Sequence, residues 1–250
     1  MFDHVSFRAT DRAATERFYD TVLPAMGEER AHRGEASTLF GNFELSVWQA
    51  ADDRPVTRGV HIGLCAPSNA AIDAFWQAGV DAGYRSDGEP GPRPEYADDY
   101  YGAFLLDPDG NSVEAVRHAN MRERGLIDHV WLRAAEIEPS KRYWRAFAEA
   151  AGLGVTADEP ELIRVRAPRG GSLTVTTGSR ASSGLHIAVP ADSPAAVDAW
   201  HASLTAAGHP SEGRPGPRDY HPSYYGAFVL DPSGHNTELV DHGGILGPRW

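Results

Sequence analysis

Six of the eleven histidines and two glutamates recur in pairs along the chain. The pairs, each 124 or 125 positions apart, are His4 with His129, His61 with His186, His118 with His242, and Glu114 with Glu238. Two imidazoles and one carboxylate on separate rigid strands can hold a divalent metal and leave coordination positions open for water or substrate. Such a metal polarises a bound oxygen, or activates dioxygen if it is iron. The pattern predicts such a site in each half of the chain. It does not choose among Zn(II), Fe(II), Ni(II) and Mn(II).

A purely structural origin of these residues must be weighed against the metal site. A strand histidine is more often a hydrogen-bonded core or edge residue than a ligand, and a strand glutamate is usually solvated. Duplication also preserves residues that have no function. However, residues 154–180 have diverged widely from their counterparts in the first half, while the paired histidines and glutamates persist. This contrast favours a metal site in at least one half.

The pairs belong to a repeat that spans nearly the whole chain. Pro90 to Arg93 matches Pro215 to Arg218, Tyr100 to Phe104 matches Tyr224 to Phe228, and Asp107 to Gly110 matches Asp231 to Gly234. Repeats of this length are whole domains rather than solenoid units. The charged stretch 120–125 reads as a linker between them. We therefore expect one domain over residues 1–119 and a second over residues 126–242.

Each copy reads as a strand, a helix and short strands, twice over, so the fold class is α+β. In the first strand Val5 and Phe7 alternate with His4, Ser6 and Arg8, which puts the histidine on the face opposite the apolar residues. Helices are expected after the capping residues Asp11, Ser68 and Ser193. If helices cover the apolar face of the sheet, the histidines line a cavity on the other face. Rigid strands would then position every ligand.

Composition limits the partners of the protein. Asp and Glu exceed Lys and Arg by 35 − 23 = 12, and no basic cluster stands out, so nucleic acid is not an expected partner. The single cysteine, Cys65, cannot form an intramolecular disulfide. With no signal peptide or long apolar run, we expect a cytoplasmic protein without a membrane partner. A small-molecule substrate is the expected partner, and a homodimer is one assembly that the sequence allows.

Several motifs in this order resemble the vicinal oxygen chelate superfamily, which includes glyoxalase I, extradiol dioxygenases and bleomycin resistance proteins. The motifs are Asp3 to Ser6 with Asp128 to Val130, Gly59 to Ile62 with Gly184 to Ile187, and Asp107 to Glu114 with Asp231 to Glu238. The resemblance implies tandem glyoxalase-like domains, each of paired βαβββ modules in a curved, barrel-like mixed sheet. It also implies the metal ligands His4, His61 and Glu114, and His129, His186 and Glu238.

The same resemblance suggests further roles. Glyoxalase-like members add a fourth ligand at a position where Glu44 stands, so Glu44 could reach the metal, act as a base, or be merely solvated; the second copy has Ser172 or a neighbour there. The segment Tyr220 to Tyr225 resembles a loop, Tyr-His-Pro-x-Tyr-Tyr, of small glyoxalase-related proteins, and its His221 could be an acid or base near the metal. The matching segment Tyr96 to Tyr101 lacks that histidine.

Four residues are candidates for substrate binding. Tyr101 and Tyr225 could donate a hydrogen bond to a substrate oxygen or lie on the rim. Arg8 and Arg133 share a strand face with the first histidine of each copy, about 13 Å along the strand, a distance that suits the far anionic end of a substrate. An exposed arginine at the end of a strand is the alternative reading of both.

These features predict a metal-dependent enzyme in which a substrate with adjacent oxygen atoms chelates the metal and Glu114, Glu238 or His221 moves a proton, or iron adds dioxygen. Lyase or isomerase chemistry and ring-opening dioxygenation both fit. The alternative is a binding protein that sequesters an antibiotic or other small molecule in an aromatic groove without chemistry. The sequence also leaves open whether each site forms within one copy or from exchanged halves, with His4 joining His186 and Glu238, and His129 joining His61 and Glu114.

Overall fold

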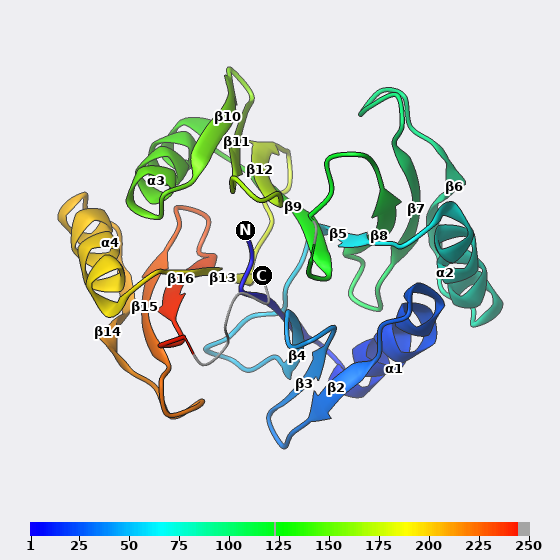
Figure 1. Ribbon diagram of the computed structural model, residues 1–250, viewed down its shortest axis with the longest axis horizontal. Coiled ribbons are helices and arrows are strands. Elements are labelled where there is room, and N and C mark those ends of the chain that lie inside the picture. The colour runs from blue at the N-terminus through cyan, green and yellow to red at the C-terminus, as the bar shows by residue number, and fades with distance from the viewer. Residues whose placement is uncertain (123, 245–250) are drawn as a thin grey trace.

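The protein is described from a computed structural model that covers residues 1–122 and 124–244 (Figure 1). The first repeat contains β1 (His4–Ala9), α1 (Arg12–Val22), the 3-10 helix η1 (Leu23–Met26), β2 (Arg30–Arg33), β3 (Ser37–Phe40), β4 (Leu45–Gln49), β5 (His61–Cys65), α2 (Asn69–Asp81), β6 (Ser86–Pro92), β7 (Tyr101–Leu106) and β8 (Ser112–Arg117). The second contains β9 (Ile127–Ala134), α3 (Ile137–Ala150), β10 (Gly154–Glu159), β11 (Leu162–Arg166), β12 (Ser172–Thr177), β13 (His186–Pro190), α4 (Pro194–Ala206), β14 (Ser211–Pro217), β15 (Tyr225–Leu230) and β16 (Asn236–Asp241).

The helices begin where their capping residues predict. Asp11 accepts a hydrogen bond from the backbone N–H of Ala14 at the start of α1, and Ser68 and Ser193 cap α2 and α4 in the same way. The stretch that begins with α1 ends at Gly27, which has a positive φ of 79° that glycine adopts without strain. Local sequence signals therefore set these three helix starts, whereas α3 follows Glu136, whose side chain makes no capping hydrogen bond.

The strands form two eight-stranded mixed sheets that curve without closing into a barrel. Sheet A has the order β14-β15-β16-β13-β1-β4-β3-β2, and sheet B has the order β10-β11-β12-β9-β5-β8-β7-β6. The halves meet through antiparallel pairs, β1 with β13 in sheet A and β5 with β9 in sheet B. Each sheet thus takes four strands from each repeat. The ranges 1–119 and 126–242 therefore describe the repeats in the sequence, whereas each sheet combines half of the first repeat with half of the second. The α+β class and the paired βαβββ modules are confirmed.

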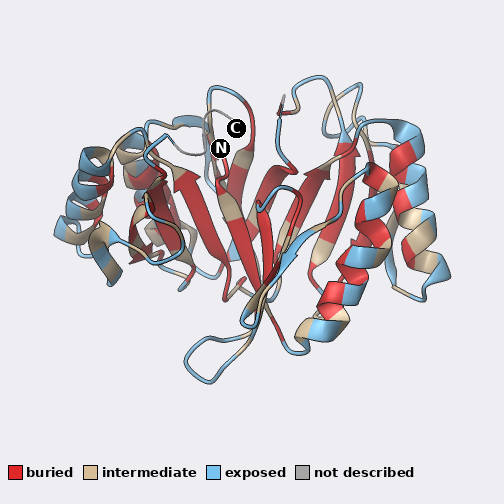
Figure 2. Ribbon diagram, turned by 60° about the horizontal axis from the view of Figure 1, so that its bottom comes forward, coloured by how far each residue is buried: buried red, intermediate tan, exposed pale blue. Residues whose placement is uncertain are grey.

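The helices cover one face of each sheet and leave the other face to the site. Helices α1 and α4 pack on sheet A and α2 and α3 on sheet B, while α1 meets α2 and α3 meets α4 across the sheets. Figure 2 shows buried strands through the middle of the molecule, with helices on both flanks that expose their outer faces. Val5, Phe7, Leu45 and Val47 are buried in the shared core, as the alternation in β1 predicts. Within the described part of the chain, no helix has the length and apolar character needed to cross a membrane.

The junction between the repeats is tied down by a buried ion pair. Arg122, only 6% exposed, places Nη1 3.1 Å from Glu44 Oε2 and donates to the carbonyl of Ile127. Glu44 Oε2 also accepts the backbone N–H groups of Leu126 and Ile127. The stretch 120–125, read as a linker, is therefore anchored to the turn before β4, although its Glu123 lies outside the described residues.

Candidate metal centres

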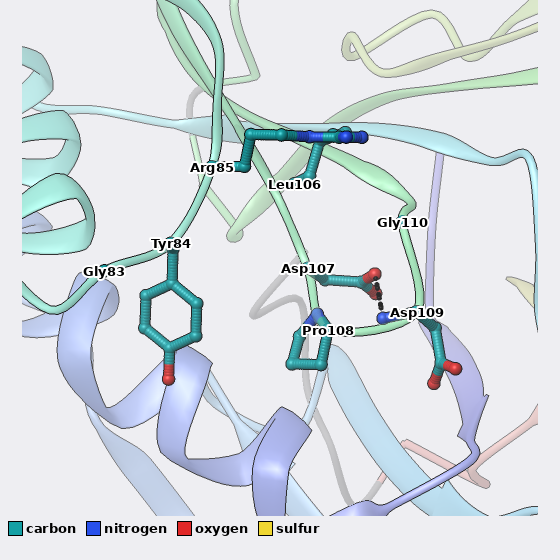
Figure 3. Close-up of a pocket in the computed structure, with 8 residues that line it drawn as sticks. All are labelled: Gly83, Tyr84, Arg85, Leu106, Asp107, Pro108, Asp109 and Gly110. Atoms are coloured by element: carbon teal, nitrogen blue, oxygen red, sulfur yellow. Dashed lines mark hydrogen bonds between the residues drawn. The ribbon is translucent and has the colours of Figure 1, made fainter.

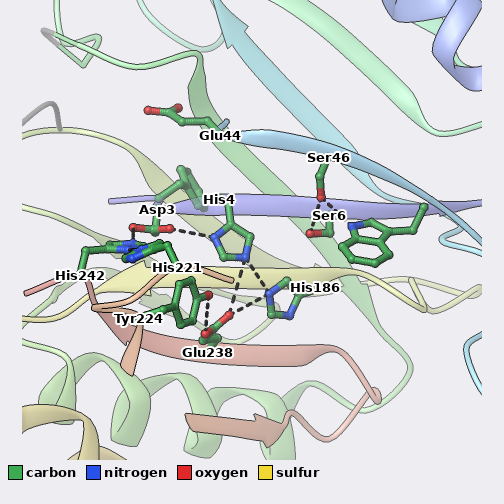
Figure 4. A network of polar contacts seen from close by, with 12 residues as sticks. Asp3, His4, Ser6, Glu44, Ser46, His186, His221, Tyr224, Glu238 and His242 are labelled. Carbon is green, nitrogen blue, oxygen red and sulfur yellow. Dashed lines mark hydrogen bonds and ion pairs between the residues drawn. The ribbon is translucent and has the colours of Figure 1, made fainter. Parts of the chain in front are cut away.

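The structure brings the predicted ligands together in the exchanged arrangement. Centre A consists of His4 on β1 with His186 and Glu238 on β13 and β16, all in sheet A (Figure 4). Centre B is its counterpart in sheet B and consists of His129, His61 and Glu114. In each centre the potential ligand atoms lie within 4.8 Å of one another. The first histidine of each repeat therefore completes the site of the other repeat.

The spacing of the ligand atoms fits a shared ion. In centre B the distances are 3.0 Å from His61 Nε2 to His129 Nε2, 3.1 Å from His61 Nε2 to Glu114 Oε2, and 3.2 Å from His129 Nε2 to Glu114 Oε2. In centre A the corresponding distances are 3.0, 3.1 and 3.6 Å. With metal–ligand bonds of about 2.1 Å, ligand atoms at right angles lie about 3.0 Å apart and at a tetrahedral angle about 3.4 Å. Both triads thus match three neighbouring positions around one divalent ion.

A buried carboxylate oxygen in centre A supports the same conclusion. Glu238 Oε2 is buried and lies against the two imidazoles, 3.1 Å from His186 Nε2 and 3.6 Å from His4 Nε2. A buried carboxylate is costly without a compensating positive charge, and a cation shared by these three atoms would supply that charge. Two imidazoles and one carboxylate, the donor set present here, suit several divalent transition metals.

A tyrosine fixes which oxygen each glutamate presents. The hydroxyl of Tyr224 donates to Glu238 Oε1 at 2.7 Å, and that of Tyr100 donates to Glu114 Oε1 at 2.8 Å. Glycine makes room for each carboxylate, because a Cβ at Gly226 or Gly102 would lie 2.5 or 2.4 Å from the same Oε1 atom. Each glutamate is thereby held with only Oε2 directed at the imidazoles.

An aspartate next to the first histidine fixes the protonation of that imidazole. His4 Nδ1 lies 2.8 Å from Asp3 Oδ1, and His129 Nδ1 lies 2.8 Å from Asp128 Oδ2. Since a carboxylate only accepts, Nδ1 carries the proton in both histidines, and in the neutral ring Nε2 is left with a lone pair for a metal. The aspartate thus orients the first histidine of each repeat in the same way.

Charges reinforce the network in centre B. Burial opposes the charged form of His129, but hydrogen bonds to Asp128 and Glu114 outweigh it and raise the pKa of His129 to about 9. Burial likewise opposes the charged form of Glu114, but hydrogen bonds from His129 and His61 lower its pKa to about 2. Without a metal, centre B is therefore an ion pair between His129 and Glu114.

Centre A extends its network by one more imidazole. His242 Nε2 lies 2.7 Å from Asp3 Oδ2, and His221 Nε2 lies 2.7 Å from His242 Nδ1. Because the N–H of Ser223 donates to His221 Nδ1, a neutral His221 carries its proton on Nε2 and donates it to His242. In centre B the equivalent His118 bonds to Asp128, and its Nδ1 accepts the N–H of Asn120. His221 is thus connected to His4 by hydrogen bonds through His242 and Asp3.

Glu44 lies outside both clusters. Figure 4 shows its carboxylate directed away from His4, and its partners are Arg122 and two backbone N–H groups. Burial raises the pKa of Glu44, and Arg122 opposes that rise. The structure therefore places Glu44 in the junction between the repeats, not beside the ligands.

Tyr101 and Tyr225 face away from the triads. Their hydroxyls donate to Asp73 on α2 and Asp198 on α4, both at 2.8 Å, on the face of the sheet that the helices cover. The neighbouring Tyr100 and Tyr224 contact the ligands instead. The register of β7 against β8 explains the difference: Phe104 pairs with Glu114, and Tyr100, four residues before Phe104, lies on the same face.

The two arginines differ in their surroundings. Arg8 is half-buried, and its charge helps to lower the pKa of His186, after the larger effect of burial. Arg133 is exposed and donates to the carbonyl of Gly59. Arg8 thus acts on the pKa of a candidate ligand, whereas Arg133 is bound to a backbone carbonyl.

A surface depression on the first repeat is separate from the chemistry. Figure 3 shows it beside the turn that precedes β8, lined by Tyr84, Arg85, Leu106 and residues 107–110. In the turn itself, the backbone N–H of Gly110 donates to the carbonyl of Asp107. None of the six triad residues lines this depression.

Comparisons with known proteins agree with the geometry. Residues 1–115 match the family described as the Glyoxalase/Bleomycin resistance protein/Dioxygenase superfamily. Glyoxalase I from Zea mays aligns with a TM-score of 0.70 and 20% identity over 99% of this chain and 94% of that one. A putative dioxygenase from Bacillus subtilis subsp. subtilis str. 168 aligns with a TM-score of 0.68 and 14% identity over 97% and 85%. At these identities the structural likeness shows the fold alone. No curated protein sequence matches the chain.

The family match covers the first repeat, and the second repeat shares its motifs and its modules. Two metal-capable triads lie at equivalent positions of the two sheets. The first repeat therefore matches the Glyoxalase/Bleomycin resistance protein/Dioxygenase superfamily over residues 1–115, and the whole chain shares the fold of glyoxalase I.

Proposed function

We propose that the protein is a metal-dependent enzyme whose two centres each bind a small substrate through two adjacent oxygen atoms. One observation carries the proposal: in both centres two Nε2 atoms and one Oε2 atom converge at 3.0 to 3.6 Å, while the other glutamate oxygen is held by a tyrosine. An array of three ligands on one side leaves positions for a chelating substrate and one further small molecule.

A divalent metal bound at such a centre would polarise the chelated oxygens and, if it were iron, would also activate dioxygen. The residues of the chain prepare that site. Asp3 and Asp128 hold the first histidines in the tautomer that leaves Nε2 without a proton, and Tyr224 and Tyr100 keep the glutamates in a fixed orientation. The concave sheet face positions all three ligands on rigid strands.

Between the two reaction classes, we favour ring-opening dioxygenation over the lyase or isomerase reaction. The position of Glu44 in the repeat junction removes the extra carboxylate that a four-ligand, proton-transferring site would use. The remaining carboxylate in each centre, Glu114 or Glu238, has one oxygen engaged by tyrosine and the other directed at the imidazoles.

Metal analysis of the purified and reconstituted protein tests the proposal. We expect two equivalents of divalent metal per chain, measured by inductively coupled plasma mass spectrometry. His61→Ala and His186→Ala should each retain one equivalent, because each removes a ligand from a different centre. His201→Ala is the matched control, since His201 bonds to Ser211 outside both triads.

The reaction is then assayed with the loaded protein. Oxygen uptake with catechols in the presence of Fe(II) would support dioxygenation, and turnover of a hemithioacetal with Ni(II) or Zn(II) would support the isomerase reaction. A protein that binds no metal at micromolar concentration after reconstitution would contradict the enzyme proposal and favour sequestration of a small molecule.

A further inference from the structure

A row of three side chains crosses sheet B beside centre B. Trp131 on β9 pairs in register with Thr174 on β12, which pairs in register with Arg164 on β11. Trp131 is two residues from His129, so the two side chains share a face of the strand and lie about 7 Å apart along it. The row therefore continues the concave surface that carries the ligands.

Arg164 is held in place without an ion pair. Its Nε donates to Thr174 Oγ1 at 2.9 Å, and Thr174 is fully buried. Its guanidinium carbon lies 5.5 Å from the centre of the Trp131 ring, within the range of a cation–π contact. Among the described residues, no carboxylate forms an ion pair with Arg164, and its two Nη atoms make no hydrogen bond. A partly buried guanidinium with two free ends is a ready receptor for a carboxylate.

Centre A has no cation at the same position. The equivalent row contains Ser6 on β1, Ser46 on β4 and Leu39 on β3. The hydroxyl of Ser46 donates to Ser6, and the indole N–H of Trp48 donates to Ser46. This row is neutral, so the two centres differ in the rows of side chains beside their candidate ligands.

We infer that Arg164 is a specificity-determining residue that binds a carboxylate on the substrate of centre B. The substrate places its adjacent oxygens at the triad of His61, Glu114 and His129, and its acidic group over Trp131 at the guanidinium. Chelation of a metal by the substrate rests on the proposed function, whereas the binding of the carboxylate by Arg164 does not. The substrate class is a small carboxylic acid that carries two adjacent oxygen atoms.

The first experiment uses metal-free protein and benzoate, which has a carboxylate but no chelating pair. We expect a saturable shift of the Arg164 Nε–H resonance in ¹⁵N NMR spectra, with the resonance assigned by its loss in Arg164→Gln. Arg166→Gln is the matched control, because Arg166 lies two residues further on the same face and donates to the carbonyl of Asn120. Arg164→Lys provides a second variant that keeps the charge.

The second experiment uses zinc-loaded protein in a His186→Ala background, which leaves only centre B. Its probes are 3,4-dihydroxybenzoate and 4-methylcatechol, compared by calorimetry. We expect the carboxylate probe to bind roughly tenfold more tightly, and Arg164→Gln to abolish that preference while the affinity for 4-methylcatechol stays within about twofold.

The outcomes separate the two proposals. The inference is overturned if benzoate gives no saturable shift, if Arg164→Gln keeps the preference, or if that variant weakens both catechols equally. If benzoate binds at Arg164 but neither catechol binds the zinc-loaded protein, chelation at the metal is wrong, whereas the carboxylate site stands.

Discussion

Centres A and B have the same network of candidate ligands, but the residues around that network differ. Both contain two histidines and a glutamate, an aspartate behind the first histidine and a tyrosine on the glutamate. Around this network the residues differ: Ala188, Ser6 and His221 in centre A correspond to Gly63, Trp131 and Ala97 in centre B. The groups that could hold a metal are thus retained in both copies, while the residues around them have diverged.

The largest expected effect comes from Gly63, which lies beneath the imidazole of His129. A Cβ at this position would lie 2.2 Å from His129 Cε1, and Asp128 holds that ring in place. We expect Gly63→Ala to remove the metal from centre B only and to lower the free energy of unfolding by about 1–3 kcal/mol. Metal analysis and chemical denaturation measure both effects.

Ala188→Gly is the matched variant in centre A, because Ala188 pairs with His4 in the same register. This change removes a methyl group and should lower the free energy of unfolding by about 0.5–1 kcal/mol. Both centres should still bind metal. Two bound equivalents in Gly63→Ala would show that the ring of His129 is not confined as described.

The pH dependence of the metal-free protein is the next effect. The pKa of His129 is raised to about 9, so its stabilising contribution is complete below pH 6.5 and is lost as the pH rises through 9. The pKa of Glu114 is lowered to about 2, so its contribution is present above pH 4.5 and is lost as the pH falls through 2.

Denaturation of the metal-free protein should therefore show a loss on the order of 1–3 kcal/mol between pH 6.5 and 9. His129→Gln should flatten this loss, and metal affinity at centre B should rise over the same range, because the metal must displace the proton of His129. A flat profile for the unsubstituted protein would contradict the ion pair in centre B.

A smaller and symmetric effect is expected at the two tyrosines. Tyr100→Phe and Tyr224→Phe each leave a glutamate Oε1 without its hydrogen bond, at nearly equal distances of 2.8 and 2.7 Å. Each change should weaken metal binding about tenfold at its own centre, measured by competition with a chelator. Unequal losses at the two centres would show that the tyrosines have different roles.

The smallest expected effect is at His221, which has no counterpart in centre B. His221→Ala removes the 2.7 Å hydrogen bond to His242, and His242 is separated from His4 by Asp3. Metal affinity at centre A should fall by about fivefold or less, while centre B provides the unchanged internal reference. A loss as large as that from Tyr224→Phe would place His221 closer to the metal than its contacts indicate.

Local patterns in the sequence predicted most of the fold. The capping residues Asp11 and Ser68, and the alternation around His4, act over a few residues and appear directly in the structure. The sequence could not predict which halves of the two repeats pair in a sheet, because β1 and β9 carry nearly the same pattern. Either strand could therefore have paired with β5, and only three-dimensional packing decides between them.

Two details of the centres depended on distant contacts. The resemblance placed Glu44 at the position of a fourth ligand, but its partner Arg122 lies 78 positions away in a stretch that reads as a linker. The choice between Tyr100 and Tyr101 depended on the register of β7 against β8. In both cases a long-range pairing, which local composition does not encode, determined the role of the residue.

The exchange of halves makes the repeats mutually dependent. The first repeat supplies one ligand of centre A and two of centre B, and the second supplies the reverse. Deleting either repeat would therefore destroy two sites rather than one. Natural selection for the activity of one centre would then preserve both repeats, even while the residues around the two sets of candidate ligands diverge.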